Sequence, residues 1–140
     1  MVLQRWQSLL LFIAVVLMGI FSVSAYGVKE SPDMLSTGIY ASENTGYWFL
    51  NILTAVVLFI AIFMFKKLNA QKCLVLLACG MMGASAIWGY NYLHRLSVAP
   101  VECHLTYTWI LLIVAFGLSV ISLFLIGADQ KLLKSYDRIR

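Results

Sequence analysis

Four long apolar segments without ionisable side chains constrain this sequence more than any other feature. They run from about residue 8 to 26, 48 to 65, 73 to 93 and 107 to 127, and none contains Asp, Glu, Lys, Arg or His. Each has about 18 to 21 residues, which at 1.5 Å per residue matches a hydrocarbon layer of roughly 30 Å. The segments are continuously apolar, not alternating, and a backbone in lipid must satisfy its own hydrogen bonds. Each is therefore predicted to be a membrane-spanning helix.

The composition excludes a water-soluble fold. The chain is 62% hydrophobic and 11% charged, with a mean hydropathy of +0.90, whereas about a quarter of the residues of a soluble domain are charged. The net charge of +4 comes from residues that flank the apolar segments and do not form a basic patch with interleaved aromatics, so no nucleic-acid partner is predicted. We predict an all-α membrane protein in which residues 1–140 form one four-helix bundle.

The distribution of basic residues predicts the orientation. Between the spans lie connections 27–47, 66–72 and 94–106, and a tail follows at 128–140. If the N-terminus is cytoplasmic, eight of the ten basic residues lie on the cytoplasmic side, as the positive-inside rule requires. Tyrosines and tryptophans gather at the opposite ends of the helices, where rings that are half apolar and half wet are favoured. We predict cytoplasmic termini, outer loops at 27–47 and 94–106, and an inner loop at 66–72.

The end of the first apolar segment resembles a signal-peptidase site. Ser22, Ser24 and Ala25 are small, and Arg5 supplies a positive start. The apolar run that precedes them is longer than the usual core of a signal peptide. We expect the first helix to be retained; cleavage would leave three spans in the same orientation.

Both ends of the chain carry recognisable motifs. The start contains Gln4, Arg5, Gln7 and Ser8, and the end, DQKLLKSYDRIR, contains Asp129, Leu132, Ser135, Asp137, Arg138 and Arg140. With the basic loop FMFKKLNAQKCLVLL, these motifs resemble a family of uncharacterised small integral membrane proteins from Bacteroidetes. The resemblance implies four helices in the bacterial inner membrane and supplies no catalytic residues.

The third span is rich in small residues, which let helix backbones approach closely. We single out Gly80, Gly83, Ala84, Ser85 and Gly89, together with Ala115 and Ser119 on the fourth span. Three interpretations stay open: packing inside the bundle, a face for a partner subunit, and a groove for lipid or quinone. We expect the third and fourth helices to pack together, because the loop between them is short. Two asparagines near the outer helix ends, at 51 and 91, are expected to bond backbone carbonyls or interfacial water.

The tail is predicted to continue the fourth helix. Leu132, Tyr136 and Ile139 would form an apolar stripe opposite basic residues. This pattern favours either contact with anionic headgroups or docking to a cytoplasmic partner or to the 66–72 loop. The candidate contact residues are Lys131, Lys134, Tyr136, Asp137, Arg138 and Arg140, with Arg5 at the other terminus.

No catalytic, cofactor or metal site is predicted. The spans lack the embedded ionisable group that marks an ion path. Cys73, Cys79 and Cys103 form no CxxC pair. The run Glu102-Cys103-His104, with His94 nearby, matches no metal spacing. We favour a non-catalytic accessory or scaffold subunit of an inner-membrane complex, whose partners are membrane lipids and other subunits. The alternatives are a small transporter or a lipid- or quinone-binding protein and, less favoured, an outer-face metal or thiol enzyme.

Overall fold

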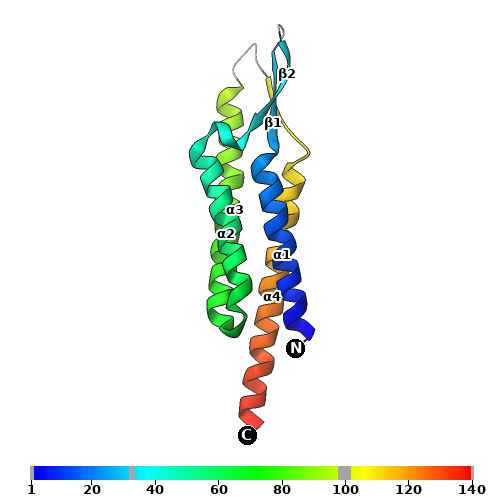
Figure 1. Cartoon of the computed structure of the whole chain (residues 1–140), viewed down its shortest axis with the longest axis vertical. Coiled ribbons are helices and arrows are strands. Elements are labelled where there is room, and N and C mark those ends of the chain that lie inside the picture. The colour runs from blue at the N-terminus through cyan, green and yellow to red at the C-terminus, as the bar shows by residue number, and fades with distance from the viewer. Residues whose placement is uncertain (1, 32–33, 98–101, 140) are drawn as a thin grey trace.

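The computed structural model of the chain describes residues 2–31, 34–97 and 102–139, with side chains over 6–30, 36–97 and 102–136, and contains four long helices (Figure 1). They are α1 (Val2–Val23), α2 (Thr45–Phe63), α3 (Leu68–Leu96) and α4 (Trp109–Ile139). All four are long and apolar enough to cross a membrane. The predicted fold class, a bundle of four such helices, is therefore confirmed.

Local hydrogen bonds set the helix boundaries. α1 ends at Val23, short of the predicted boundary, where the hydroxyls of Ser22 and Ser24 donate to the carbonyls of Gly19 and Ile20 at 2.7 and 2.8 Å. Such bonds compete with the helical ladder and favour a helix end. α2 begins after Asn44, whose Oδ1 accepts from the Tyr47 backbone N–H at 3.3 Å. α4 runs to Ile139 without a break, so the tail continues the fourth helix.

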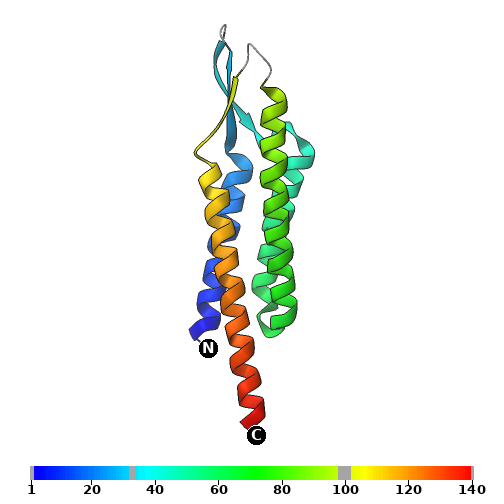
Figure 2. The same ribbon diagram turned by 180° about the vertical axis from the view of Figure 1, so that it is seen from behind.

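The helices form a closed ring in which each packs against two neighbours. α1 contacts α2 and α4, and α3 contacts the same two helices (Figure 2). The expected contact between α3 and α4 is present, but α4 packs more extensively against α1. At one end, which we call the terminal end, α1 begins, α4 ends and the short 3₁₀ helix η2 (Met64–Lys66) joins α2 to α3.

A small antiparallel sheet caps the opposite end, here called the sheet end. Its strands are β1 (Ala25–Ser31), β2 (Met34–Tyr40) and β3 (Glu102–Leu105), in the order β2-β1-β3. Gly27 of the central strand pairs with Ile39 on one side and with Leu105 on the other. A 3₁₀ turn, η1 (Ala41–Glu43), leads from β2 into α2. Both segments predicted as outer loops therefore contribute strands to one sheet, which was not predicted from the sequence.

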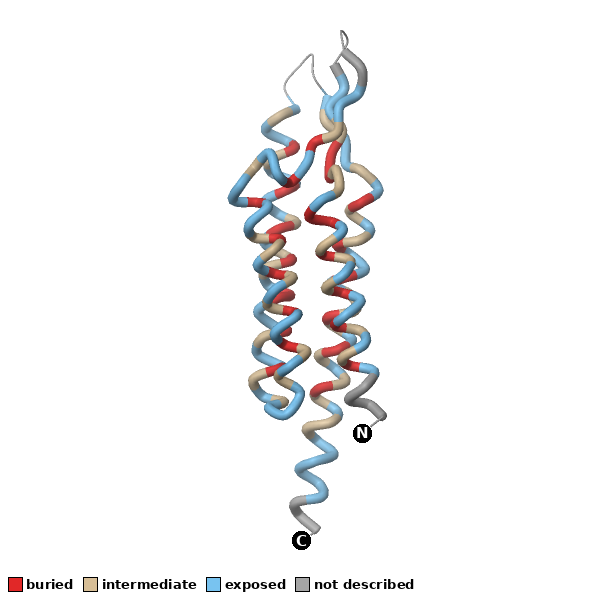
Figure 3. Tube along the Cα trace, in the orientation of Figure 1, coloured by how far each residue is buried: buried red, intermediate tan, exposed pale blue. Residues whose placement is uncertain are grey.

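The core lies between the four helices, where the buried residues line the interior of the bundle (Figure 3). On α1 these residues recur at helical spacing, and they meet buried residues of the other three helices: Leu11, Ala14, Met18, Phe21, Leu58, Ala61, Val75, Ala78, Met82, Leu112, Ala115 and Ile126. Large apolar side chains also cover the outside, as with Phe124, which is 75% exposed. Apolar side chains on both faces are typical of a helix that packs against protein on one side and lipid on the other.

Candidate functional site

The outward face of α3 carries an exposed stripe with small residues at its centre. Cys73, Leu77, Gly80, Ala84, Ile87 and Asn91 are all exposed and recur at alternating spacings of four and three. We call these six residues the α3 stripe. The alternation matches the seam along which two helices pack side by side. A Cβ atom added at Gly80, or at neighbouring Gly83, would meet nothing within 4 Å. These two glycines therefore leave the middle of the outward face open.

Two of the small residues singled out on α3, Ser85 and Gly89, face the interior. Ser85 and Gly89 are buried, and the Ser85 hydroxyl donates to Asn51 Oδ1 of α2 at 2.6 Å. Asn51 Nδ2 in turn donates to the Tyr47 carbonyl at 3.0 Å, which confirms the backbone bond expected for this asparagine. A Cβ atom added at Gly89 would lie 2.8 Å from the Tyr47 hydroxyl and 3.3 Å from Cη2 of Trp109. Because Gly89 has no side chain, the rings of Tyr47 and Trp109 can both pack against α3 at this position.

The rings of Tyr26, Tyr47 and Trp109 form an aromatic cluster under the sheet. The centroids of Tyr26 and Tyr47 are 5.0 Å apart, and Trp109 Nε1 donates to the Tyr26 carbonyl at 2.7 Å. Tyr26 lies in β1, beyond the end of α1 at Val23; it is fully buried, and its hydroxyl has no hydrogen-bond partner among the described residues. Burial, with a smaller contribution from Tyr47, raises the pKa of the Tyr26 hydroxyl well above its usual value. The Tyr26 hydroxyl is thus neutral, and the cluster packs the sheet against the helices.

The small residues singled out on α4 also face the core. Ala115 and Ser119 are fully buried, and the Ser119 hydroxyl donates to the Ala115 carbonyl at 2.9 Å. A hydroxyl that bonds one turn back along its own helix needs no partner on a second helix. Because both residues are fully buried, they belong to the internal seam of the bundle.

At the terminal end, two side-chain hydrogen bonds join α4 to its neighbours. Gln7 Nε2 of α1 donates to Asp129 Oδ2 at 2.7 Å, and Gln130 Nε2 donates to Asn69 Oδ1 of α3 at 3.0 Å. Gln7 and Asp129 each belong to one of the two terminal motifs, so the bond links motifs at opposite ends of the chain. Nothing in the sequence alone pairs these residues.

The Gln7–Asp129 bond yields a stability prediction. A Gln7→Glu variant replaces the amide donor by a second carboxyl group against Asp129, and losing a hydrogen bond to a charged group costs about 2 kcal/mol. We expect a lower unfolding temperature in detergent at neutral pH, because the donor of the bond is lost. The matched control is Gln130→Glu, which makes the same change at an exposed hydrogen bond. Equal effects in the two variants would contradict a specific role for Gln7.

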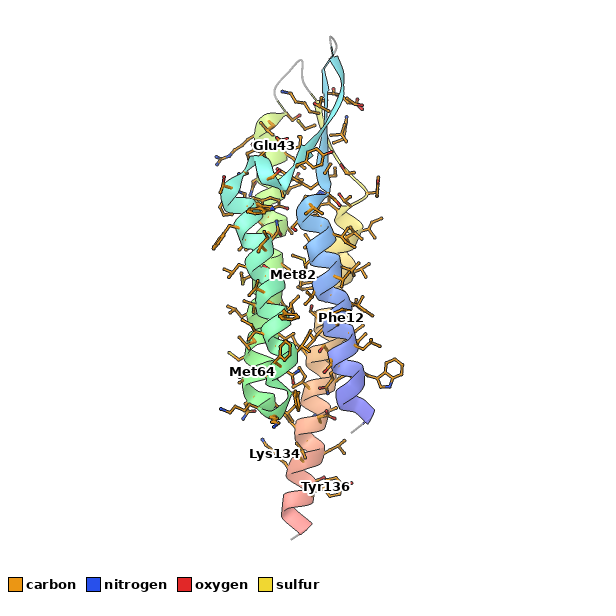
Figure 4. The ribbon with its side chains drawn as sticks, viewed as in Figure 1. Phe12, Glu43, Met64, Met82, Lys134 and Tyr136 are labelled. Atoms are coloured by element: carbon orange, nitrogen blue, oxygen red, sulfur yellow. The ribbon has the colours of Figure 1, made fainter. Side chains whose placement is uncertain are left out.

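The tail residues lie where α4 extends beyond the other helices (Figure 4). Lys131, Lys134 and Tyr136 are exposed. The side chains of Arg5, Asp137 and Arg138 lie outside the described residues, as does Arg140 altogether. The candidate contact residues whose side chains the structure describes in the tail are therefore two exposed lysines and an exposed tyrosine. Their role in contacts with lipid or a partner stays a prediction.

The polar run on β3 forms one weak surface pair. His104 Nε2 lies 3.6 Å from Glu102 Oε2, and both side chains are more than half exposed. Cys103 lies between them on the strand, and successive side chains of a strand point to opposite faces. Among the described residues, no three His, Cys, Asp or Glu side chains converge as metal ligands would.

Comparison with known proteins identifies the chain by its family alone. No curated protein and no solved structure matches it. One family model, described as a domain of unknown function (DUF4293), matches residues 3–139. The match covers all three strands and the four helices from residue 3 onward, so the chain belongs to the DUF4293 family of unknown function.

Proposed function

We propose that this protein is a non-catalytic accessory or scaffold subunit of a protein complex in the bacterial inner membrane, with both termini in the cytoplasm. Its contact with the neighbouring subunit would be the α3 stripe. The observation that carries the proposal is that Gly80 and Ala84, two small residues four apart on this helix, face outward and not into the bundle.

The energetics of helices in lipid favour this use of the stripe. Lipid tails are as apolar as leucine, so helices associate through close packing and interhelical hydrogen bonds, for which Gly and Ala leave room. A glycine within a helix costs about 1 kcal/mol relative to alanine in helix propensity. Close packing of a partner helix against Gly80 would offset that cost, whereas lipid chains would not.

The stripe also offers larger side chains and a polar group. Leu77 and Ile87 flank the small pair and would interdigitate with a facing helix. Near the sheet end, exposed Asn91 lines a surface pocket of about 350 Å³ with Trp88, Tyr92 and Arg95. An amide in this position can hydrogen-bond a polar group on the neighbouring subunit. The absence of ionisable residues from the predicted spans supports a structural role over proton-coupled transport.

Site-specific photocrosslinking in intact cells tests the proposal. Ile87 on the stripe and Ile113 on α4 are each 66% exposed, so a photoreactive residue at either position samples the membrane equally. We expect a discrete adduct with another membrane protein from position 87 and none from position 113. Gly80→Leu should abolish the adduct, because the larger side chain fills the close-packed gap. Gly19→Leu, which also places a side chain where nothing lies within 4 Å, should leave it unchanged.

Two results would contradict the proposal. Adducts of equal yield and pattern from both positions would mean that the stripe has no preferred partner. An adduct of twice the chain mass of 15.7 kDa would indicate self-association and not membership of a larger complex.

A further inference from the structure

A surface pocket at the terminal end brings together segments that are far apart in the sequence. It has a volume of about 480 Å³ and lies where the η2–α3 junction meets α4. From the junction come Lys66, Lys67, Leu68, Asn69 and Ala70, and from α4 come Gln130, Leu133 and Lys134. The bond from Gln130 Nε2 to Asn69 Oδ1 ties the two walls together. We call it the lysine pocket.

The charge of the lysine pocket is entirely positive. Three of its lining residues are lysines and none is acidic. Among the side chains that the structure describes, none of these lysines forms an ion pair. Three like charges around one small volume repel one another, and this repulsion is relieved when an anion occupies the space between them.

The start of α3 adds to the positive potential. The helix begins at Leu68, and its cap residue, Lys67, makes no side-chain hydrogen bond to the first turn. That turn contains no acidic residue, and Leu68, Asn69 and Ala70, which belong to it, line the pocket. The first backbone N–H groups of a helix have no partner within the helix and carry partial positive charge. Both the lysines and the backbone therefore favour an anion.

The position of the pocket selects the kind of anion. It lies at the end of the spanning helices, next to η2 and the last turn of α2, where Phe63 and Phe65 are 65% and 44% exposed. Leu68 and Leu133 add apolar surface to the lining. A ligand for such a site joins a negatively charged group to an apolar body at the membrane surface. Basic pockets between helices on the cytoplasmic side suit lipid headgroups.

We propose that the lysine pocket binds the phosphate headgroup of an anionic glycerophospholipid. The lysine ammonium groups and the first turn of α3 receive the phosphate, and the two leucines contact the glycerol and the upper acyl chains. Figure 4 shows Lys134 on the α4 side of this region, next to the loop between α2 and α3. The proposal uses none of the six residues of the α3 stripe.

Lipid titration of the purified full-length protein in a neutral detergent, followed by thermal unfolding and native mass spectrometry, tests the proposal. The probes are phosphatidylglycerol, phosphatidylcholine and inorganic phosphate. We expect phosphatidylglycerol alone to raise the unfolding temperature and to remain bound. Stabilisation by inorganic phosphate at equal concentration would identify a site for soluble phosphates. Equal binding of phosphatidylcholine would show that the pocket does not distinguish an anionic headgroup from a zwitterionic one. Either result would overturn the proposal.

A charge-matched pair of variants separates the pocket from general surface charge. Lys67→Gln/Lys134→Gln removes two pocket lysines, whereas Lys72→Gln/Lys131→Gln removes two lysines from the same region that do not line the pocket. One lysine in contact with a bound anionic headgroup changes affinity about fivefold, so loss of two such lysines should weaken phosphatidylglycerol binding to the pocket variant at least tenfold. The control should lose less than threefold, and Lys67→Arg/Lys134→Arg should retain binding. Equal losses in the two Gln variants would contradict the proposal. Unfolding temperatures without lipid identify any variant that is simply misfolded.

Discussion

Replacing Gly89 by leucine is expected to open the sheet end of the bundle and to lower its stability by about 3 kcal/mol or more. Even a single Cβ atom at this position would approach the Tyr47 hydroxyl to 2.8 Å, its Cζ to 3.2 Å and Trp109 to 3.3 Å. Both rings are held by other contacts, so neither can withdraw without disturbing α2 or α4. The unfolding temperature of the purified variant in detergent measures the effect. Gly80→Leu, on the opposite face of the same helix, should unfold like the wild type.

A double-mutant cycle locates the clash. Gly89→Ala alone should destabilise the protein by about 1–3 kcal/mol. Tyr47→Phe removes the atom nearest to the new Cβ, so the double variant should recover part of the loss, with a coupling energy of about 1 kcal/mol or more. Strictly additive effects, or a Gly89→Leu variant as stable as Gly80→Leu, would contradict this arrangement of the aromatic cluster.

Replacing Trp109 by alanine is expected to detach the sheet from the helices. The indole N–H donates to the Tyr26 carbonyl at 2.7 Å, and the ring packs edge-to-face on Phe21 with centroids 6.3 Å apart. Truncation of a packed tryptophan costs about 3–5 kcal/mol, and a half-buried ring belongs at the lower end of that range. Thermal unfolding reports the loss of stability, and faster hydrogen exchange in β1 reports the release of the sheet.

Two controls sharpen the Trp109 experiment. Trp109→Phe keeps an aromatic ring but loses the indole donor, which should cost about 1 kcal/mol. The Tyr26 carbonyl still accepts from the Thr106 backbone N–H at 3.3 Å. Trp6→Ala removes a tryptophan that is 58% exposed on α1 and should change stability little. If Trp109→Ala were no worse than Trp6→Ala, Trp109 would not anchor the sheet.

The four helices could be predicted from the sequence because each segment that crosses lipid must form its backbone hydrogen bonds within itself. A backbone in hydrocarbon must be helical, and twenty apolar residues reveal the span directly. The sheet could not be predicted in the same way, since its pairings join residues far apart in the chain, such as Val28 and His104. The dipeptide Pro32-Asp33 between the β1 and β2 sequences is a turn signal and was the available indication of a hairpin.

Two pairs of small residues on α3, Gly80 with Ala84 and Ser85 with Gly89, show what periodicity can and cannot decide. Gly80 and Ser85 are five residues apart, which places them about 140° apart around a helix, so the two pairs had to occupy different faces. Hydropathy cannot tell which face is internal, because the lipid and the core are equally apolar. The hydrogen bond between Gln7 and Asp129 could not be predicted either, because a single sequence gives no indication of a contact between two residues so far apart in the chain.

A topology reporter fused after Arg140, compared with one fused after Ser97 in a truncated chain, tests most directly that hydrocarbon surrounds four crossings with both termini in the cytoplasm. Placement of Ser97 at the sheet end predicts opposite signals from the two fusions. A fluorescent protein that matures only in the cytoplasm should be bright after Arg140 and dark after Ser97, and alkaline phosphatase should show the reverse. Phosphatase activity from the Arg140 fusion would place the tail outside and contradict the orientation on which the proposed contacts depend.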